Sequence, residues 1–141
     1  QMSLPGRVLH SLRYFHSFPS LSSLRLSSSR LIPQGDLILT KAARQRLDQI
    51  LSPEEKLRIE VEGGGCAGFE YKIRLDSTVA PDDMVVNDGE KDIVVVDEMS
   101  LAYIRGSTVD YVEDLMKASF RVLANPLADK GCSCGTSFAL K

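Results

Sequence analysis

Two stretches of the chain alternate apolar and polar residues with a period of two, the pattern of a half-buried β-strand. Apolar residues occupy the odd positions of residues 57–62 and again of residues 69–75. Between these stretches, residues 63–68 read Gly-Gly-Gly-Cys-Ala-Gly. The pattern predicts two strands joined by a glycine-rich connection.

Shorter patterns predict the neighbouring elements. Residues 36–40 read as a short strand, and Thr40 is placed to cap a helix over residues 41–51, because its hydroxyl can accept a hydrogen bond from the first helical turn. Further on, an apolar stretch at residues 84–86, a turn signal and a β-branched run at residues 93–96 together predict a hairpin.

The last third of the chain is less regular. Residues 99–104 fit a short helix that ends at Gly106. Residues 107–123 fit two strands better than one helix, since apolar residues alternate in both halves, although a helical face remains an alternative. An Asn-Pro pair at 125–126 ends this region, and residues 127–130 are predicted to be a connector. The expected fold class is therefore mainly β with a few short helices (α+β).

Composition limits the class of protein. With 141 residues the chain fits a single core, since domains commonly run to about 100–150 residues. Its 43% hydrophobic and 26% charged residues are near the globular average, which argues against wholesale disorder. No apolar run approaches the ~20 residues that a membrane-spanning helix needs, so no membrane association is expected.

Charge divides the chain into two parts. Residues 1–35 hold four arginines, nine serines and both histidines, but no acid and no lysine, whereas residues 36–141 hold all 19 acidic residues and 13 basic ones. The first part matches an organellar transit peptide, expected to be disordered, with an ordinary serine-rich tail as the alternative. The second part is one acidic domain, so nonspecific nucleic-acid binding is not expected.

The three cysteines are the chain's candidate chemistry. Cys66 lies in the glycine-rich connection, and Cys132 and Cys134 lie in the sequence Gly-Cys-Ser-Cys-Gly at residues 131–135. No histidine follows His16. Thiols on flexible backbone, with no imidazole available, suggest a metal site built from sulfur.

Several interpretations of these thiols are open. Cys66 alone could be a small buried hydrophobic residue, and the odd cysteine count disfavours a disulfide framework. A structural zinc site normally takes four Cys or His ligands, and this chain offers three. Cys132 and Cys134 could instead be the nucleophile and the resolving thiol of a thiol/disulfide redox enzyme, although the usual motif has two intervening residues.

Iron is the remaining interpretation, either as iron alone in an iron chaperone or as an iron–sulfur cluster. Thiolates are the usual cluster ligands, and a stable cluster ordinarily takes four of them. The missing ligand could come from a second chain or from an exchangeable outside donor. Glycines beside the thiols allow backbone N–H groups to turn toward a negatively charged cluster.

The cysteine motifs resemble those of a known family. Residues 63–69 (Gly-Gly-Gly-Cys-Ala-Gly-Phe), the Asn-Pro pair and residues 131–135 together resemble the A-type iron–sulfur carriers, the HesB/IscA family, over residues 36–141. Within that family the chain looks most like the second mitochondrial paralogue. Ala67 stands where serine is expected, a change that touches no cysteine.

The resemblance implies a fold and a binding site. It implies a compact domain of two packed mixed sheets, a β-sandwich or barrel, that is not an enzyme. It implies that Cys66, Cys132 and Cys134 bind iron or a labile [2Fe–2S] or [4Fe–4S] cluster. Tyr71, five residues after Cys66, is a further candidate near the iron, although an aromatic residue on a strand is more often part of a core.

The resemblance also implies partners and a location. Family members act in the mitochondrial matrix, late in the maturation of [4Fe–4S] proteins, as a homodimer or as a heterodimer with the sister A-type paralogue. A monothiol glutaredoxin is the expected donor, and a folate-binding-like assembly factor is an expected partner. Apo [4Fe–4S] enzymes such as aconitase and lipoate synthase are the expected clients.

Overall fold

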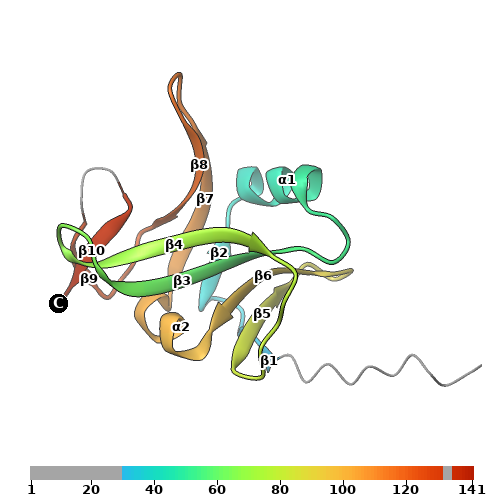
Figure 1. Cartoon of the computed structure of the whole chain (residues 1–141), viewed down its shortest axis with the longest axis horizontal. Helices are drawn as coiled ribbons and strands as arrows, with labels where there is room; N and C mark the ends of the chain where they lie inside the picture. The colour runs from blue at the N-terminus through green and yellow to red at the C-terminus, as the bar shows by residue number, and fades with distance from the viewer. Residues whose placement is uncertain (1–29, 132–134) are drawn as a thin grey trace, which may run out of the picture.

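The computed structural model of the chain describes residues 30–131 and 135–141. Two mixed β-sheets and two short helices make up this part of the chain (Figure 1). The predicted fold class, mainly β with a few short helices, is therefore confirmed.

The larger sheet has seven strands. In spatial order they are β1 (Arg30–Leu31), β5 (Asp83–Asn87), β6 (Asp92–Asp97), β3 (Lys56–Gly64), β4 (Gly68–Asp76), β10 (Ser137–Leu140) and β9 (Ala128–Gly131). β1 runs parallel to β5 and β3 runs parallel to β6, while the other neighbours are antiparallel. The predicted strands at residues 57–62 and 69–75 are thus the paired β3 and β4.

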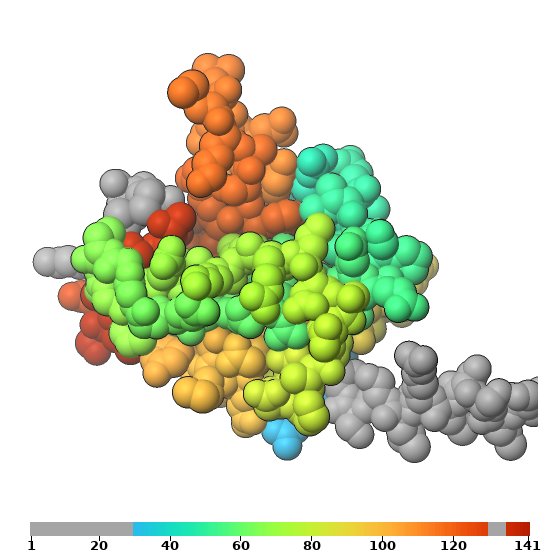
Figure 2. Space-filling view, viewed as in Figure 1, coloured from blue at the N-terminus to red at the C-terminus, as the bar shows by residue number. Residues whose placement is uncertain are grey.

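The smaller sheet has three strands, in the order β2 (Leu37–Leu39), β7 (Ser107–Glu113) and β8 (Ala118–Leu123). β7 and β8 form an antiparallel hairpin, which confirms the two-strand prediction for residues 107–123. Figure 1 and Figure 2 show the end of this hairpin standing clear of the rest of the molecule.

Both predicted helices are present, and side-chain caps start them. α1 (Lys41–Ile50) begins after Thr40, whose Oγ1 accepts a hydrogen bond from the Ala43 N–H at 3.1 Å. α2 (Glu98–Ile104) begins after Asp97, and Gly106 follows it with a φ of 81°. None of the helices in the described residues is long and apolar enough to cross a membrane.

The hydrophobic core lies between the two sheets. β3 and β6 contribute buried aliphatic residues from the larger sheet, and β7 and β8 contribute Val109 and Val122 from the smaller one. α1 adds Ala43 and Leu47, which are completely buried. Because each element buries one apolar face against the same core, the described residues fold around a single hydrophobic centre.

Three strands were not predicted from the sequence. Residues 127–130, predicted to be a connector, form most of β9, so that prediction is wrong. β1 and β10 also appear where no strand was expected. β9 contains Ala, Asp, Lys and Gly rather than β-branched residues, and its extended form comes from pairing with β10.

One polar position departs from the predicted alternation. Arg58, on the expected polar face of β3, is only 6% exposed. Its guanidinium makes two hydrogen bonds to the carboxylate of Asp83, at 2.8 and 3.1 Å, and a third to Asp76 at 2.9 Å. A fourth goes to the carbonyl of Thr78 at 2.8 Å. The charge of Arg58 can be buried because these four hydrogen bonds replace the ones that the guanidinium would make to water.

The two carboxylates respond to this environment. Burial by itself raises the pKa of Asp83, but hydrogen bonds from Arg58 and from the Ala80 N–H outweigh it, and the net pKa is lowered. The pKa of Asp76 is also lowered, first by the backbone N–H of Thr78 and then by Arg58. Both carboxylates therefore stay deprotonated to a lower pH in the folded chain than in the unfolded one.

We expect Asp83→Ala to lower the free energy of unfolding by about 3–5 kcal/mol, because it leaves the buried Arg58 without its main counter-ion. Glu62→Ala is the matched control, since Glu62 pairs with Lys72 where both side chains are about half exposed. The control should cost at most ~1 kcal/mol. Urea unfolding followed by circular dichroism measures the free energy of unfolding of both variants. Equal losses would contradict the role of Asp83 as the main counter-ion of Arg58.

The lowered pKa values also predict an acid-side loss of stability. As pH falls below about 4, the unfolded carboxylates take up protons before the folded ones do, so stability present above that pH is lost. In Asp83→Asn one of these groups cannot titrate, and the decline should be shallower. Urea midpoints measured from pH 7 to pH 3 test this, and parallel curves for the two proteins would contradict it.

Candidate metal site

Cys66 lies at the turn of the β3–β4 hairpin and is exposed. The two strands stay in antiparallel register up to the Gly64↔Gly68 pair, and only three residues join them. Gly65 has a φ of 71°, and a Cβ on it would lie 2.9 Å from the Cβ of Ser137. A side chain at position 65 is therefore disfavoured both by the backbone conformation and by the neighbouring strand.

Ser137 reaches the cysteine turn from the far end of the chain. β10 pairs with β4 in the register Ser137↔Glu70 and Phe138↔Phe69, which brings its first residue beside the turn. The Oγ of Ser137 lies 3.2 Å from the Sγ of Cys66, and the two atoms share a hydrogen bond. Ser137 is only 4% exposed, so this hydroxyl is held at the inner side of an exposed thiol.

Cys132 and Cys134 lie outside the described residues. The residues that flank this segment are Gly131, which ends β9, and Gly135, which comes two residues before β10. Gly131 is opposite Phe138 in the β9–β10 pairing, and Phe138 is opposite Phe69 beside the cysteine turn. The described ends of the second cysteine motif thus belong to the same side of the larger sheet as Cys66.

Tyr71, the further candidate, belongs to an aromatic cluster. Its ring stacks on Phe138 with centroids 4.5 Å apart, and Phe69 lies between Phe138 and Tyr103 at 5.6 and 5.2 Å. The Tyr71 hydroxyl accepts a hydrogen bond from the side chain of Asn125 at 3.1 Å. Burial raises the pKa of Tyr71, so this phenol stays protonated in the neutral range. Its contacts are those of a packing residue.

Asn125 ties the aromatic cluster to the start of β9. Its amide donates to the Tyr103 carbonyl at 2.9 Å as well as to Tyr71, and its Oδ1 accepts from the Leu127 N–H at 3.0 Å. The preceding Ala124 has a φ of 52°, a strained conformation for a residue with a side chain. The Asn-Pro pair therefore does more than end a strand, because it directs the chain into β9.

Sequence reasoning missed Ser137. The only local signal is Thr-Ser-Phe-Ala-Leu after Gly135, a stretch too short to identify as a strand. Its role depends on β10 adding to the edge of β4, a contact between residues about 70 positions apart. Within residues 30–131 and 135–141, no three Cys, His, Asp or Glu side chains converge as metal ligands would.

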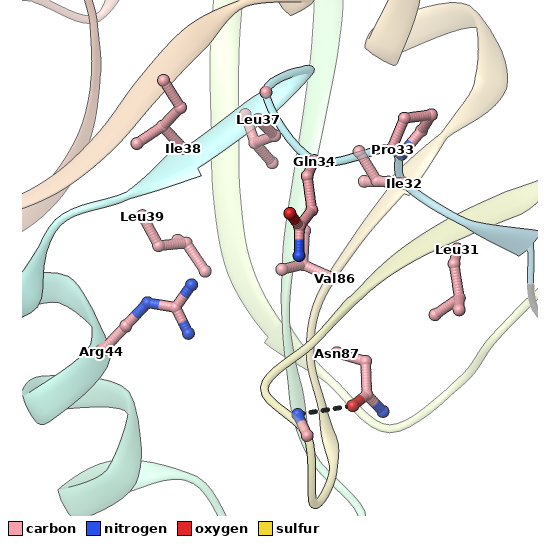
Figure 3. Close-up of a pocket in the computed structure, with 12 residues that line it drawn as sticks. Leu31, Ile32, Pro33, Gln34, Leu37, Ile38, Leu39, Arg44, Val86 and Asn87 are labelled. Carbon is pink, nitrogen blue, oxygen red and sulfur yellow. Dashed lines mark hydrogen bonds between the residues drawn. The ribbon is translucent and has the colours of Figure 1, made fainter.

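A cavity of about 520 Å³ lies elsewhere in the molecule, between residues 31–39, α1 and the end of β5 (Figure 3). Its lining is mostly aliphatic, with polar groups from Gln34, Arg44 and Asn87. Among the described residues, the cavity lining includes no cysteine, histidine or carboxylate. This part of the chain therefore offers the cavity none of the usual ionisable ligands for iron.

Comparisons with known proteins agree with the family resemblance. Residues 36–136 match the family model described as iron-sulphur cluster biosynthesis. The chain is 49% identical over 115 residues to the human protein "Iron-sulfur cluster assembly 2 homolog, mitochondrial", covering 82% of this chain and 74% of that one. It is 42% identical over 106 residues to the cluster insertion protein ErpA of Hydrogenovibrio crunogenus, covering 72% and 91%.

Solved structures agree with the fold. IscA, in a crystal structure "with the [2Fe-2S] cluster", is similar with a TM-score of 0.65 and 29% identity, over 74% of this chain and 98% of that one. SufA of Escherichia coli is similar with a TM-score of 0.61 and 27% identity, over 78% and 97%. These homologues are cluster assembly and carrier proteins, not catalytic enzymes. The chain belongs to the iron-sulphur cluster biosynthesis family, the HesB/IscA family.

Proposed function

We propose that this protein is an iron–sulfur carrier that holds its cargo through Cys66, Cys132 and Cys134. The observation that carries the proposal is the hydrogen-bonded contact between exposed Cys66 and Ser137, because Ser137 begins the strand that follows the Cys-Ser-Cys segment. Chain connectivity thus limits how far Cys134 can be from Cys66. Thiolates are the common ligands of iron–sulfur clusters, which fits the donors present.

The site suits cargo that is bound and then passed on. Cys66 is exposed at a hairpin turn, so a thiol of an acceptor protein can approach it. Three thiols per chain also leave an ordinary four-thiolate cluster short of one ligand. We infer that a second chain supplies thiols, as a homodimer or as a heterodimer with the sister A-type paralogue. The cargo is a [2Fe–2S] cluster, a [4Fe–4S] cluster formed from it, or iron.

The proposed place of action is the mitochondrial matrix. The mammalian relatives are named as mitochondrial proteins, and residues 1–35 have the composition of a transit peptide. There the protein would act late in the maturation of [4Fe–4S] enzymes. A monothiol glutaredoxin would donate the cluster, and a folate-binding-like factor would assist its delivery.

Anaerobic reconstitution with iron and sulfide, followed by native mass spectrometry, tests the proposed function by counting chains, irons and sulfides together. We expect iron and acid-labile sulfide to be bound together. Iron without sulfide would instead support an iron chaperone. A Cys132–Cys134 disulfide that forms and breaks during turnover would support a redox enzyme.

We expect each of Cys66→Ser, Cys132→Ser and Cys134→Ser to speed release of the cluster by at least about tenfold. Losing a ligand weakens cluster binding more than losing a hydrogen-bond partner of that ligand does. The fold should persist, because Cys66 lies on an exposed turn. Ala67→Ser is the control, since it alters the same turn and keeps every thiol. Iron release to a chelator measures the effect, and unchanged retention in all three variants would overturn the ligand assignment.

Ser137→Ala should weaken cluster retention without removing a ligand. When Cys66 is a thiolate it cannot donate, so the Ser137 hydroxyl must donate to the sulfur, which favours the more negative, reduced cluster. We expect a lower reduction potential and release faster by up to about tenfold. Ser100→Ala is the control, because Ser100 is equally buried and its Oγ accepts from the Val61 N–H away from the cysteines. Equal potentials in Ser137→Ala and the wild type would contradict this role.

A further inference from the structure

Glu70 lies beside the cysteine turn, in a row of side chains that crosses three strands of the larger sheet. Its partners directly across the sheet are Glu62 on β3 and Ser137 on β10. Residues paired in this way point to the same face, with their Cβ atoms about 4.5–5.5 Å apart. Ser137 is the residue whose hydroxyl contacts the Sγ of Cys66. Glu70 is therefore the immediate neighbour of the cysteine's own hydrogen-bond partner.

The cysteine turn closes over the same row. A Cβ on Gly65 would lie 2.9 Å from the Cβ of Ser137 and 3.6 Å from the Cβ of Glu70. Cys66 is the next residue, and its Sγ meets Ser137 on this face of the sheet. A glutamate carboxylate stands on a flexible stem beyond its Cβ. The carboxylate of Glu70 can therefore reach a metal ion that the Cys66 thiolate holds.

Glu70 also differs from the other two glutamates on this face of the hairpin. The cations of β4 pair with acids of β3, Lys72 with Glu62 and Arg74 with Glu60. The pKa of Lys72 is raised first by its hydrogen bond to Glu62, and the charge of Glu70 contributes less. No ion pair in the described part of the chain includes Glu70. A half-buried carboxylate next to the thiol is thus available to a bound cation.

A thiolate and a carboxylate together suit iron that is bound and then passed on. Carboxylate oxygen is a harder donor than thiolate sulfur, and iron accepts both kinds of ligand. Thiolates are the usual ligands of iron–sulfur clusters. A carboxylate is therefore the ligand that an arriving thiolate displaces first.

We propose that the Glu70 carboxylate is an oxygen ligand to iron held at Cys66, in the coordination position that a thiolate of a second protein later takes. In that exchange the bond from iron to Glu70 breaks and a bond from iron to sulfur forms. The incoming thiol gives its proton to solvent, so one anion replaces another and the oxidation state of iron does not change. This inference rests on the proposed function, because it assigns a further ligand to the same site.

The test compares Glu70→Gln with Glu60→Gln in the full chain. Both variants remove one negative charge from the same face of the hairpin, but only position 70 neighbours Ser137. In the absence of sulfide and oxygen, we expect Glu70→Gln to raise the dissociation constant for Fe²⁺ by at least about tenfold. Glu60→Gln should bind Fe²⁺ like the wild type. Competition with a chromophoric chelator measures these constants, and wild-type affinity in Glu70→Gln would overturn the assignment.

Copper(I) separates a metal ligand from a residue that only supports the turn. Cu(I) prefers soft thiolate donors and gains little from a carboxylate. We therefore expect Glu70→Gln to bind Cu(I) as tightly as the wild type does, whereas Cys66→Ser should lose affinity for both metals. If Glu70→Gln weakened Fe²⁺ and Cu(I) binding equally, its role would be structural and the ligand assignment would be wrong.

Reconstitution with iron and sulfide distinguishes this inference from the proposed function. If the wild type takes up both while Glu70→Gln keeps the wild-type affinity for Fe²⁺, the carrier function stands and the Glu70 assignment falls. If Glu70→Gln weakens Fe²⁺ binding but the wild type takes up no sulfide, the Glu70 assignment stands and the cluster carrier function falls.

Discussion

The pairing of β10 with β4 is the contact on which the cysteine site depends. β4 leaves the Cys66 turn, and β10 begins just after the Cys-Ser-Cys segment, so their hydrogen bonds join the two halves of the motif. The approach is close enough that a side chain at position 65 would have to displace Ser137. The Ser137 hydroxyl and the stacked ring of Phe138 take their places from this one strand addition.

The other end of β3 and β4 is held by a different kind of contact. There Arg58 reaches across the larger sheet to Asp76 and Asp83, and buries its charge among satisfied acceptors. One long hairpin therefore has a rigid ionic anchor at its base and an exposed thiol at its turn. This division suits the proposed carrier function, because Cys66 can be accessible while the strands that position it stay fixed.

Local sequence determined most of the elements. The period-two alternation identified β3 and β4, the β-branched run identified β6, and Thr40 and Gly106 marked a helix start and a helix end. These signals act over a few residues, so a sequence displays them directly. The glycine-flanked cysteines and their resemblance to a family likewise predict the ligands, because the ligand type follows from the residues themselves, and that assignment stays a prediction.

Tertiary structure decided what depends on distant neighbours. β9 and β10 are strands because each pairs with another strand. Arg58 is buried because the carboxylate of Asp83, on another strand of the larger sheet, accepts its hydrogen bonds. Ser137 meets Cys66 from 71 residues away, a contact that no local pattern encodes. The sequence by itself thus determined the chemistry available and the hairpin that carries Cys66. Long-range strand pairing decided which residues contact Cys66 and hold its hairpin, since that pairing depends on the whole sheet.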